Sequence, residues 1–395
     1  MSHRARSRLR RAGHLLVAVG FVLLGARCGD GGSVSGPPPG LVLASVRAGF
    51  HHTCGLASSG VAYCWGFNLF GQLGTADTVS RLLPAAVLGG LEYKELSAGH
   101  GHTCALVASG AAYCWGRNEH GELGSQTADS VFTPAPVSGG NTFASVSAGN
   151  GYSCAVTGGG AAYCWGYDNA GQLGNGTLTS ASVYTPTPVG GGITFASVTA
   201  GDGVHTCGLT ASGAAHCWGD NLYGQLGDGT STTRTAPVPA ASGTSFWMIG
   251  VGEGYTCGLA TTNVVYCWGL NDFGQLGAGT LLNNPSPSAV GGSLRFKWLS
   301  VGTCHACALT TAGAAYCWGR NNHGQLGNGT ADGSRVPVQV HGGLVFTTLS
   351  ADDYHACGLT TAGAAYCWGR NDRGQLGDGT ATDRTTPVRV AAPAP

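Results

Sequence analysis

The stretch AYCWGFNLFGQLG, residues 62–74, decides the fold, because the chain repeats it along its length. Its Gly-Gln-Leu-Gly part recurs, once with Glu for Gln, at residues 121–124, 171–174, 224–227, 274–277, 324–327 and 374–377. Its Cys-Trp-Gly part recurs in the same register, starting at Cys114, Cys164, Cys217, Cys267, Cys317 and Cys367. The spacing is 50 residues, with one interval of 53, so the chain is an array of seven similar units.

Each unit reads as four short strands separated by turns that contain glycine. In the second unit these strands are LEYKELSA (91–98), HTCALV (102–107), AAYCW (111–115) and PAPV (134–137). The prolines of the last strand suit the edge of a sheet, because they cannot donate a ladder hydrogen bond.

Seven units of four strands predict an all-β, seven-bladed β-propeller with four-stranded blades. A solenoid would need atypical end repeats, yet the first and last units keep the full pattern. We expect residues 387–390 to pair with residues 41–48 in one composite blade. Pairing of the N- and C-terminal strands would then close the ring.

The composition fits this fold and excludes several classes of protein. The 395 residues include 70 glycines without a collagen period, and 43% of the chain is apolar, which argues against disorder. Only 10% of the residues are charged and the net charge is zero. A nucleic-acid partner is not expected, because no basic stripe is present to neutralise phosphates.

The first 40 residues have the order of an export signal. Five arginines between Arg4 and Arg11 precede an apolar run over residues 15–26, which is too short to span a bilayer. We predict a signal peptide over 1–27, a Gly/Ser/Pro-rich linker over 28–40 and the propeller over 41–395. Residues 24–28 also resemble a lipoprotein signal with Cys28 as the lipid acceptor, although Arg27 stands where a small residue is usual. A lipid on Cys28 would be the only membrane attachment, and a secreted or cell-envelope location is expected.

Fourteen of the sixteen cysteines form seven C-x9-C pairs, each bracketing one hairpin. Antiparallel pairing places the two cysteines of a hairpin opposite each other, within reach of a disulfide. Disulfides are expected, and reduced core thiols or a metal site are the alternatives. The pairs are Cys54/Cys64, Cys104/Cys114, Cys154/Cys164, Cys207/Cys217, Cys257/Cys267, Cys307/Cys317 and Cys357/Cys367.

Cys304 has no counterpart in the other units. With Cys307 it forms a C-x-x-C motif, which is a redox or metal signal elsewhere. Because Cys307 already has Cys317 in register, we expect Cys304 to be an unpaired thiol.

Repeated residues are expected to be core, so function should lie where the units differ. A His or Tyr precedes the first hairpin cysteine in every unit and is expected to pack. Two loops vary, one between the first and second strands and one after Cys-Trp-Gly, and both emerge at the same end of each blade. The binding candidates on these loops are Phe50, His51, Phe70, His100, Arg117, His120, Tyr167, Tyr223, Phe273, Arg320, His323, Tyr354, Arg370 and Arg373. Aromatic side chains and Arg with little Lys are typical of binding surfaces.

Motifs for catalysis are missing from the sequence. It contains no G-x-S-x-G elbow, no H-E-x-x-H and no phosphate-binding P-loop. We therefore expect a binding protein without catalytic residues, metal or cofactor, rather than an enzyme.

Three motifs together resemble the regulator-of-chromosome-condensation repeat: HTCAL (102–106), YCWGRN (113–118) and GQLG-x-GT (171–177). The resemblance covers residues 41–390 and implies a seven-bladed propeller. Some secreted bacterial propellers with this repeat, including a β-lactamase-inhibitor type, bind proteins through one loop face. The member that named the family exchanges guanine nucleotide on a small nuclear GTPase and binds chromatin.

The resemblance and the export signal together predict an extracytoplasmic binding scaffold. We expect a monomer that recognises a protein or envelope ligand through its variable loops. Two alternatives stay open: an exchange-factor-like regulator of a small GTPase, and a structural envelope or adhesion module. Export, paired cysteines and zero net charge argue against the GTPase partner.

Overall fold

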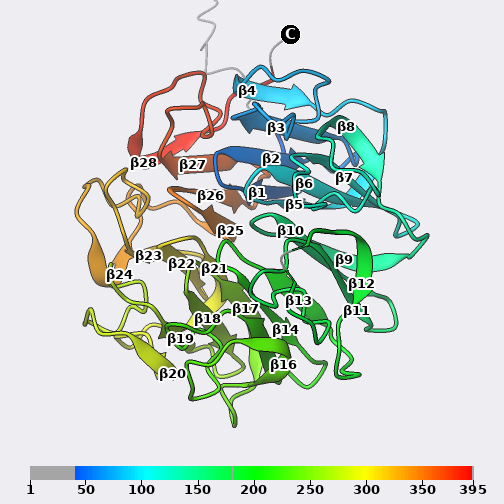
Figure 1. Ribbon diagram of the computed structural model, residues 1–395. Coiled ribbons are helices and arrows are strands. Elements are labelled where there is room, and N and C mark those ends of the chain that lie inside the picture. The colour runs from blue at the N-terminus through cyan, green and yellow to red at the C-terminus, as the bar shows by residue number, and fades with distance from the viewer. Residues whose placement is uncertain (1–40, 180, 394–395) are drawn as a thin grey trace, which may run out of the picture. The chain divides into compact units, whose positions relative to one another are not determined.

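The computed structural model describes residues 41–179 and 181–393, which form seven separate sheets. Each sheet has four antiparallel strands in chain order, and together the sheets make a seven-bladed propeller (Figure 1). The predicted fold class is confirmed. No helix in the described residues is long and apolar enough to cross a membrane. The predicted signal peptide, linker and Cys28 lie outside the described residues.

In every blade the chain runs from the strand at the channel outward. The first strands are β1 (Ser45–Ala48), β5 (Tyr93–Ala98), β9 (Phe143–Ala148), β13 (Ser197–Ala200), β17 (Phe246–Val251), β21 (Phe296–Val301) and β25 (Phe346–Asp352). The second strands are β2 (His52–Leu56), β6 (His102–Val107), β10 (Tyr152–Thr157), β14 (His205–Leu209), β18 (Tyr255–Ala260), β22 (His305–Thr310) and β26 (His355–Thr360). Blade 1 is β1 to β4, and blade 7 is β25 to β28.

The outer half of each blade contains the Cys-Trp-Gly strand and the proline-bearing edge strand. The third strands are β3 (Ala62–Gly66), β7 (Ala112–Gly116), β11 (Ala162–Gly166), β15 (Ala215–Gly219), β19 (Val265–Gly269), β23 (Ala315–Gly319) and β27 (Ala365–Gly369). The fourth strands are β4 (Arg81–Ala86), β8 (Val131–Pro136), β12 (Val183–Pro188), β16 (Arg234–Ala240), β20 (Asn284–Ala289), β24 (Ser334–Gln339) and β28 (Arg384–Arg389).

The hydrophobic core lies between neighbouring blades, and this explains the repeated signature. The indole N–H of Trp115 donates to the carbonyl of Gln72 in the preceding blade at 2.9 Å, and Leu73 is fully buried beside it. Gly74 has φ +71°, and a Cβ there would lie 2.9 Å from Trp115 Nε1. The same Trp bond spans all seven blade junctions at 2.9–3.0 Å. Each unit therefore contributes its Trp to the junction with the preceding blade and its Gly-Gln-Leu-Gly segment to the junction with the following blade.

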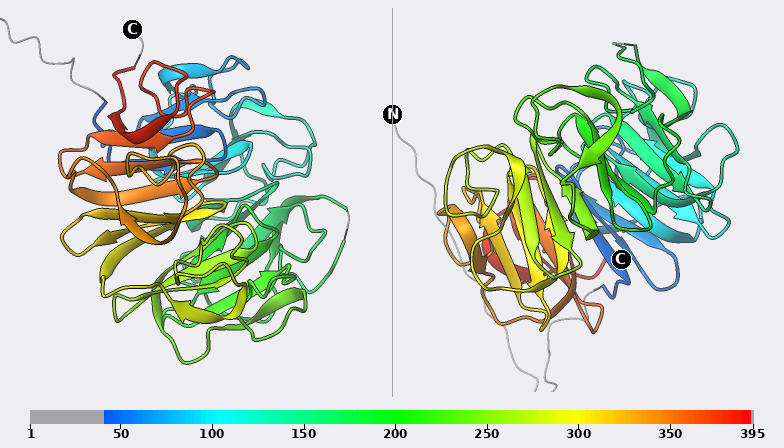
Figure 2. Two further views of the ribbon diagram at one scale, coloured as in Figure 1. Left: turned by 90° about the vertical axis from the view of Figure 1, so that its left-hand side faces the viewer. Right: turned by 90° about the horizontal axis from the view of Figure 1, so that it is seen from below.

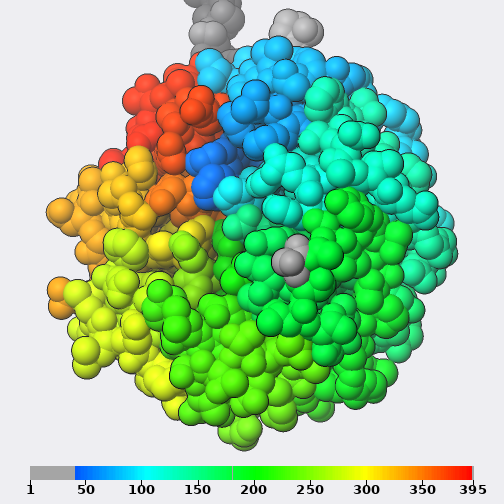
Figure 3. Space-filling view, in the orientation of Figure 1, coloured from blue at the N-terminus to red at the C-terminus, as the bar shows by residue number. Residues whose placement is uncertain are grey.

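The predicted composite blade is wrong. Strand β1 pairs with β2 and β28 pairs with β27, so the first and last strands belong to different sheets. The ring closes as every other junction does, with Trp65 Nε1 donating to Gln375 O at 2.9 Å and Leu43 N to Gly363 O at 2.8 Å. Figures 2 and 3 show the blue first blade lying directly beside the red last blade. No strand exchange is needed, because each unit already completes a four-stranded sheet.

The seven predicted disulfides are confirmed. Each joins directly opposed residues of the second and third strands, with Cα–Cα distances of 4.0–4.1 Å. Cys304 is a free and buried thiol, because Cys307 is bonded to Cys317. Burial and the nearby Glu253 raise the pKa of Cys304 to about 12, so this thiol is protonated at pH 7.

The recurrent histidines pack between blades, as predicted. His52 is fully buried, its Nε2 lies 2.9 Å from Thr103 Oγ1 of the next blade, and burial lowers its pKa to about 3. Tyr152 and Tyr255 fill the same position in blades 3 and 5 and are equally buried. These residues therefore connect neighbouring blades from within the core.

Candidate binding face

The two variable loops of each blade lie together at one end of the propeller. A backbone hydrogen bond joins them in every blade, for example from Phe67 N to His51 O and from Arg370 N to Tyr354 O, both at 2.9 Å. We call this end the loop face; it consists of the loops between first and second strands and between third and fourth strands. The predicted placement of the loops is therefore confirmed, whereas binding by them stays a prediction.

On blades 5 to 7 the predicted residues form a continuous stack. The guanidinium carbon of Arg320 lies 4.9 Å from the ring centre of Phe273 and 4.8 Å from that of Tyr354. Its Nη1 also donates to the Tyr354 hydroxyl at 3.1 Å. Arg370 approaches Tyr354 at 5.5 Å, and the His323 ring centre lies 5.2 Å from it. Three blades thus contribute to one cation–aromatic cluster.

Similar pairs continue across blades 1 to 3. The rings of Phe50 and His100 lie 3.6 Å apart, and Phe50 also contacts His51. Arg117 covers Phe70 at 5.6 Å, and the rings of His120 and Tyr167 are 4.5 Å apart. These contacts cross the junctions between blades 1 and 2 and between blades 2 and 3, so the stack extends around most of the ring.

Three further residues, Arg373, Phe67 and Tyr223, complete this description of the face. Arg373 lies over Phe67 at 5.4 Å, which connects blade 7 with blade 1. Phe67 was not among the predicted candidates, although it occupies the same place after Cys-Trp-Gly as Arg117 and Tyr167. Tyr223 stands apart from the stacked pairs; it is 40% exposed and borders a surface pocket that includes Leu222.

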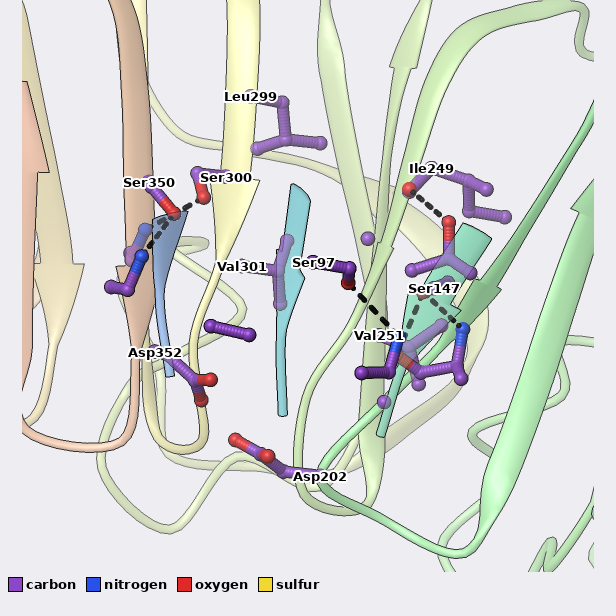
Figure 4. Close-up of a pocket in the computed structure, with 18 residues that line it drawn as sticks. Ser97, Ser147, Asp202, Ile249, Val251, Leu299, Ser300, Val301, Ser350 and Asp352 are labelled. Carbon is purple, nitrogen blue, oxygen red and sulfur yellow. Dashed lines mark hydrogen bonds between the residues drawn. The ribbon is translucent and has the colours of Figure 1, made fainter. Parts of the chain in front are cut away.

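A central channel runs between the first strands of all seven blades and holds a cavity of about 200 Å³. Serine hydroxyls on its wall accept backbone N–H groups from the next blade, as Ser350 does from Ala48 at 2.9 Å and Ser97 from Ala148 at 2.9 Å. Figure 4 shows these serines on the channel wall. These hydroxyls therefore accept backbone N–H groups of the first strands, which have no neighbouring strand on the channel side.

Acidic side chains gather where the channel meets the loop face. The carboxylates of Asp202 and Asp352 point toward each other across the channel (Figure 4), and Thr303 Oγ1 donates to Asp202 Oδ2 at 2.6 Å. Asp353 is only 1% exposed. Burial and the charge of Asp202 raise the pKa of Asp353 to about 8, and the same two causes raise the pKa of Asp352. We call Asp202, Asp352 and Asp353 the acidic mouth.

The acidic mouth was missed by sequence reasoning, although one signal for it exists. Asp352 replaces a glycine that the other six units keep at residues 49, 99, 149, 201, 252 and 302. His51 lies 3.7 Å from Asp353, but burial and Arg370 lower the pKa of His51 to about 4. The imidazole is therefore neutral at pH 7 and adds no positive charge to the mouth.

The loop face combines arginines held over aromatic rings with an acidic centre. Within residues 41–179 and 181–393, no three His, Cys, Asp or Glu side chains are arranged to share a metal ion. Guanidinium groups bind carboxylates and aromatic faces, whereas the raised pKa values of Asp352 and Asp353 keep these two carboxyl groups largely protonated near pH 7. The arrangement suits recognition of a ligand that has carboxylate or aromatic groups.

The repeat pattern described as regulator of chromosome condensation (RCC1) repeat matches most of the chain. It covers residues 59–106, 109–156, 159–209, 263–309, 312–359 and 362–394. A second pattern of the same description matches residues 44–72, 93–122, 143–172, 195–225, 249–275 and 346–375. No curated protein sequence matches this chain significantly.

Several solved structures share the fold. Human WBSCR16 has a TM-score of 0.76 at 21% identity, covering 84% of this chain and 94% of that protein. Prp20p of Saccharomyces cerevisiae has a TM-score of 0.74 at 23% identity, covering 85% and 87%. The ectodomain of the Physcomitrella patens receptor kinase CR4 has a TM-score of 0.53 at 23% identity, covering 83% and 74%. At these identities the likeness concerns the fold alone.

Proposed function

The chain belongs to the RCC1 repeat family, and from that premise we propose that it is an extracytoplasmic binding scaffold. Its loop face would recognise a protein or an envelope ligand. The observation that supports this most strongly is the stack of arginines and aromatic rings, which neighbouring blades hold in place before any ligand arrives. Side chains that are already ordered lose little entropy on binding, which favours affinity.

The seven disulfides support the extracytoplasmic part of the proposal. Such bonds persist in oxidising compartments and are rare in the cytosol. The predicted signal peptide points to the same location. Intact mass of the protein from its own envelope fraction tests both points. A chain without its first 26 or 27 residues and with fourteen blocked cysteines is expected, and added lipid mass would place the anchor on Cys28.

An exchange-factor-like role is the alternative. Prp20p of Saccharomyces cerevisiae, which shares the fold, binds Gsp1p and histones. A full-length chain with sixteen free thiols would overturn the extracytoplasmic proposal and favour this role. A structural envelope or adhesion module is the remaining candidate, and it requires no ligand on the loop face.

A capture experiment tests the loop face directly. The purified mature chain is cross-linked within its own envelope fraction, and partners are quantified by mass spectrometry. The variant Arg320→Ala/Arg370→Ala removes the centre of the cation–aromatic cluster and should lower specific capture about tenfold, as expected for a binding hot spot. The control Arg335→Ala/Arg389→Ala removes the same charge from the outer strands β24 and β28. Equal capture by both variants would reject the loop face as the binding surface.

A further inference from the structure

The end of the propeller opposite the loop face is built from equivalent positions in all seven blades. Because consecutive strands are antiparallel, the turns between second and third strands lie at this end, together with the connections from each fourth strand to the next first strand. We call this end the turn face. Each first strand begins beside the turn of the preceding blade; Phe246 N donates to Gly213 O and Phe296 N donates to Asn263 O, both at 2.9 Å. Equivalent residues of the seven blades therefore form a ring around the channel at the turn face.

A β-bulge at the start of the first strand directs one side chain out of the sheet. In blade 5, Phe246 lies opposite Ala260 and Met248 lies opposite Leu259, so Trp247 between them is the extra residue of the bulge. The register shifts in the same way in blades 2, 3, 6 and 7. Bulges of this kind re-aim a side chain. The residue at this position is exposed in every blade: Ala44, Lys94, Ala144, Ala196, Trp247, Lys297 and Thr347.

Large and charged side chains gather on one part of this ring. Trp247 is 67% exposed, whereas the seven tryptophans of the Cys-Trp-Gly motifs are fully buried. In blade 6 the exposed Arg295 stands two residues before Lys297. Val345 of blade 7 and Val42 of blade 1 have the position of Arg295 and are 55% and 59% exposed. We call Trp247, Arg295, Lys297, Val345 and Val42 the basic arc.

The members of the basic arc belong to adjoining blades. The first strands of these blades pack against one another in the order β17, β21, β25 and β1. A Cβ on Gly313 would lie 2.8 Å from Val345 Cγ1, and a Cβ on Gly363 would lie 2.8 Å from Val42 Cγ1. Each valine therefore covers the turn of the preceding blade, so the arc continues across the blade junctions.

The two ends of the propeller differ in charge. Among the described residues, the turns, connections and bulges of the turn face carry only four Asp, Glu, Lys or Arg side chains: Glu92, Lys94, Arg295 and Lys297. After residue 40, every acidic residue except Glu92 and Glu95 lies in the loops of the loop face or at the end of β25. Both exceptions belong to blade 2, outside the basic arc. The arc therefore combines an exposed indole with positive charge that no acidic residue of the arc balances.

We propose that the basic arc contacts an anionic phospholipid surface and thereby turns the loop face away from the membrane. Tryptophan is enriched at the membrane–water interface, and Lys and Arg near the surface are attracted to anionic headgroups. Ala and Thr at the other bulges leave room for a close approach of the turn face. A two-fold dimer would instead place the arc against its own copy, so both sides of the contact would be positive.

The place where the chain enters the propeller supports this orientation. Leu41 is next to Val42 of the basic arc, and the predicted lipid acceptor Cys28 precedes Leu41 by thirteen residues. A fully extended chain of that length spans at most about 45 Å, so an anchor on Cys28 would hold the turn face near the membrane. One acyl chain alone gives reversible attachment, and a basic patch is a common second attachment. The basic arc would therefore add a membrane contact to the one expected from the sequence.

The test uses the chain from Cys28 onward, with the Cys28 thiol coupled to a maleimide-headgroup lipid in vesicles, so that native lipidation is not required. The vesicles contain brominated phosphatidylglycerol or brominated phosphatidylcholine, whose bromine atoms quench an indole that enters the interface. Seven of the nine tryptophans are fully buried and Trp298 is partly buried, so quenching reports mainly Trp247. We expect quenching by the anionic lipid only, and its loss at about 1 M salt, where the screening length is about 3 Å.

The variant Arg295→Ser/Lys297→Ser removes both cations of the arc and should lower quenching by the anionic lipid about tenfold, because each basic residue near an anionic surface contributes to the attraction. Blade 5 has Ser245 at the position of Arg295, so the variant should fold. The matched control is Lys94→Ser, which changes a lysine at the same bulge position on blade 2, beside Glu92 and outside the arc. It should leave the quenching unchanged.

Equal quenching by neutral and anionic lipid, or equal losses in the variant and the control, would overturn the proposal. So would a dimer in solution that Trp247→Ser abolishes, because a second copy would then cover the arc. Arg320→Ala/Arg370→Ala should keep full quenching, which separates this test from the capture experiment on the loop face. A loss of quenching in that variant would place the membrane contact on the loop face and contradict the proposal.

Discussion

At the scale of single residues, the departures from the repeat have the largest physical consequences. Asp352 replaces a repeated glycine, and Asp353 beside it is buried with neither carboxylate oxygen hydrogen-bonded among the described residues. A carboxyl group whose pKa is higher in the folded chain than in the unfolded chain loses stability as the pH rises, because the unfolded chain gives up its proton first. The acidic mouth should therefore make the fold less stable in base.

Asp353→Asn should remove much of this pH dependence. The pKa of Asp353 is about 8 in the folded chain against 3.8 for a free carboxyl. The wild type should lose about 2–4 kcal/mol of unfolding free energy relative to Asp353→Asn between about pH 4 and pH 8. Urea unfolding across that range measures the difference. The control is Asp372→Asn, which changes an exposed carboxyl group whose pKa is lowered in the folded chain. Parallel stability profiles of the wild type and Asp353→Asn would contradict the prediction.

Ala356→Thr should stabilise the junction between blades 6 and 7. His355 Nε2 lies 2.8 Å from Thr53 Oγ1 at the ring closure. Blade 7 has Ala356 at the position equivalent to Thr53, and neither ring nitrogen of His305 in blade 6 has a described hydrogen-bond partner. A threonine hydroxyl would supply the missing bond, worth about 0.5–1.5 kcal/mol. Thermal unfolding measures the gain. Ala356→Val adds the same volume without the hydroxyl, and an equal gain from it would refute the explanation.

At the scale of elements, the disulfide-bonded hairpin is the common unit of the blades. The second and third strands pair in register, with Cys54 opposite Cys64 in blade 1 and the equivalent pair opposed in each other blade. All fourteen cysteines are fully buried, so each bridge also fills the core between blades. Stability therefore depends on local cross-links as well as on packing between blades.

Cys104→Ala/Cys114→Ala should cost about 2–3 kcal/mol, because it frees a short loop in the unfolded chain. The measurement is urea unfolding under non-reducing conditions. Cys54→Ala/Cys64→Ala in blade 1 should cost a similar amount, since the junction at the ring closure is built like the internal ones. A much larger loss in blade 1 would indicate a special role for the closing blade.

At the scale of the whole molecule, the ring contains no strand exchange, and its closing junction repeats the internal ones. The Trp65–Gln375 bond and the Ser350–Ala48 bond are both 2.9 Å long, as are the equivalent Trp115–Gln72 and Ser97–Ala148 bonds between consecutive blades. The point at which the chain begins should therefore matter little for stability, provided that whole blades stay intact.

A circular permutant tests this expectation. It would start at Leu91 before β5, end at Gly90, and join residue 393 to Leu41 through a flexible linker of about ten glycine and serine residues. We expect seven disulfides by mass spectrometry and a melting midpoint within a few degrees of the mature chain. A permutant opened at Gly110, inside the β6–β7 hairpin, is the control and should be clearly less stable. Equal destabilisation of both would show that the original ends matter.

The sequence by itself determined the blades, the disulfides, the buried histidines and the placement of the variable loops. All of these depend on residues close together in one unit, and the unit is written seven times. Only the tertiary structure decided how the ring closes, which loop residues stack across blades, and that Asp202 lies beside Asp352. Those contacts join residues of different blades, up to about 300 positions apart, whose distances no local pattern encodes. The repeat predicts each blade, but the curvature of the whole ring decides which of the residues that depart from the repeat come into contact.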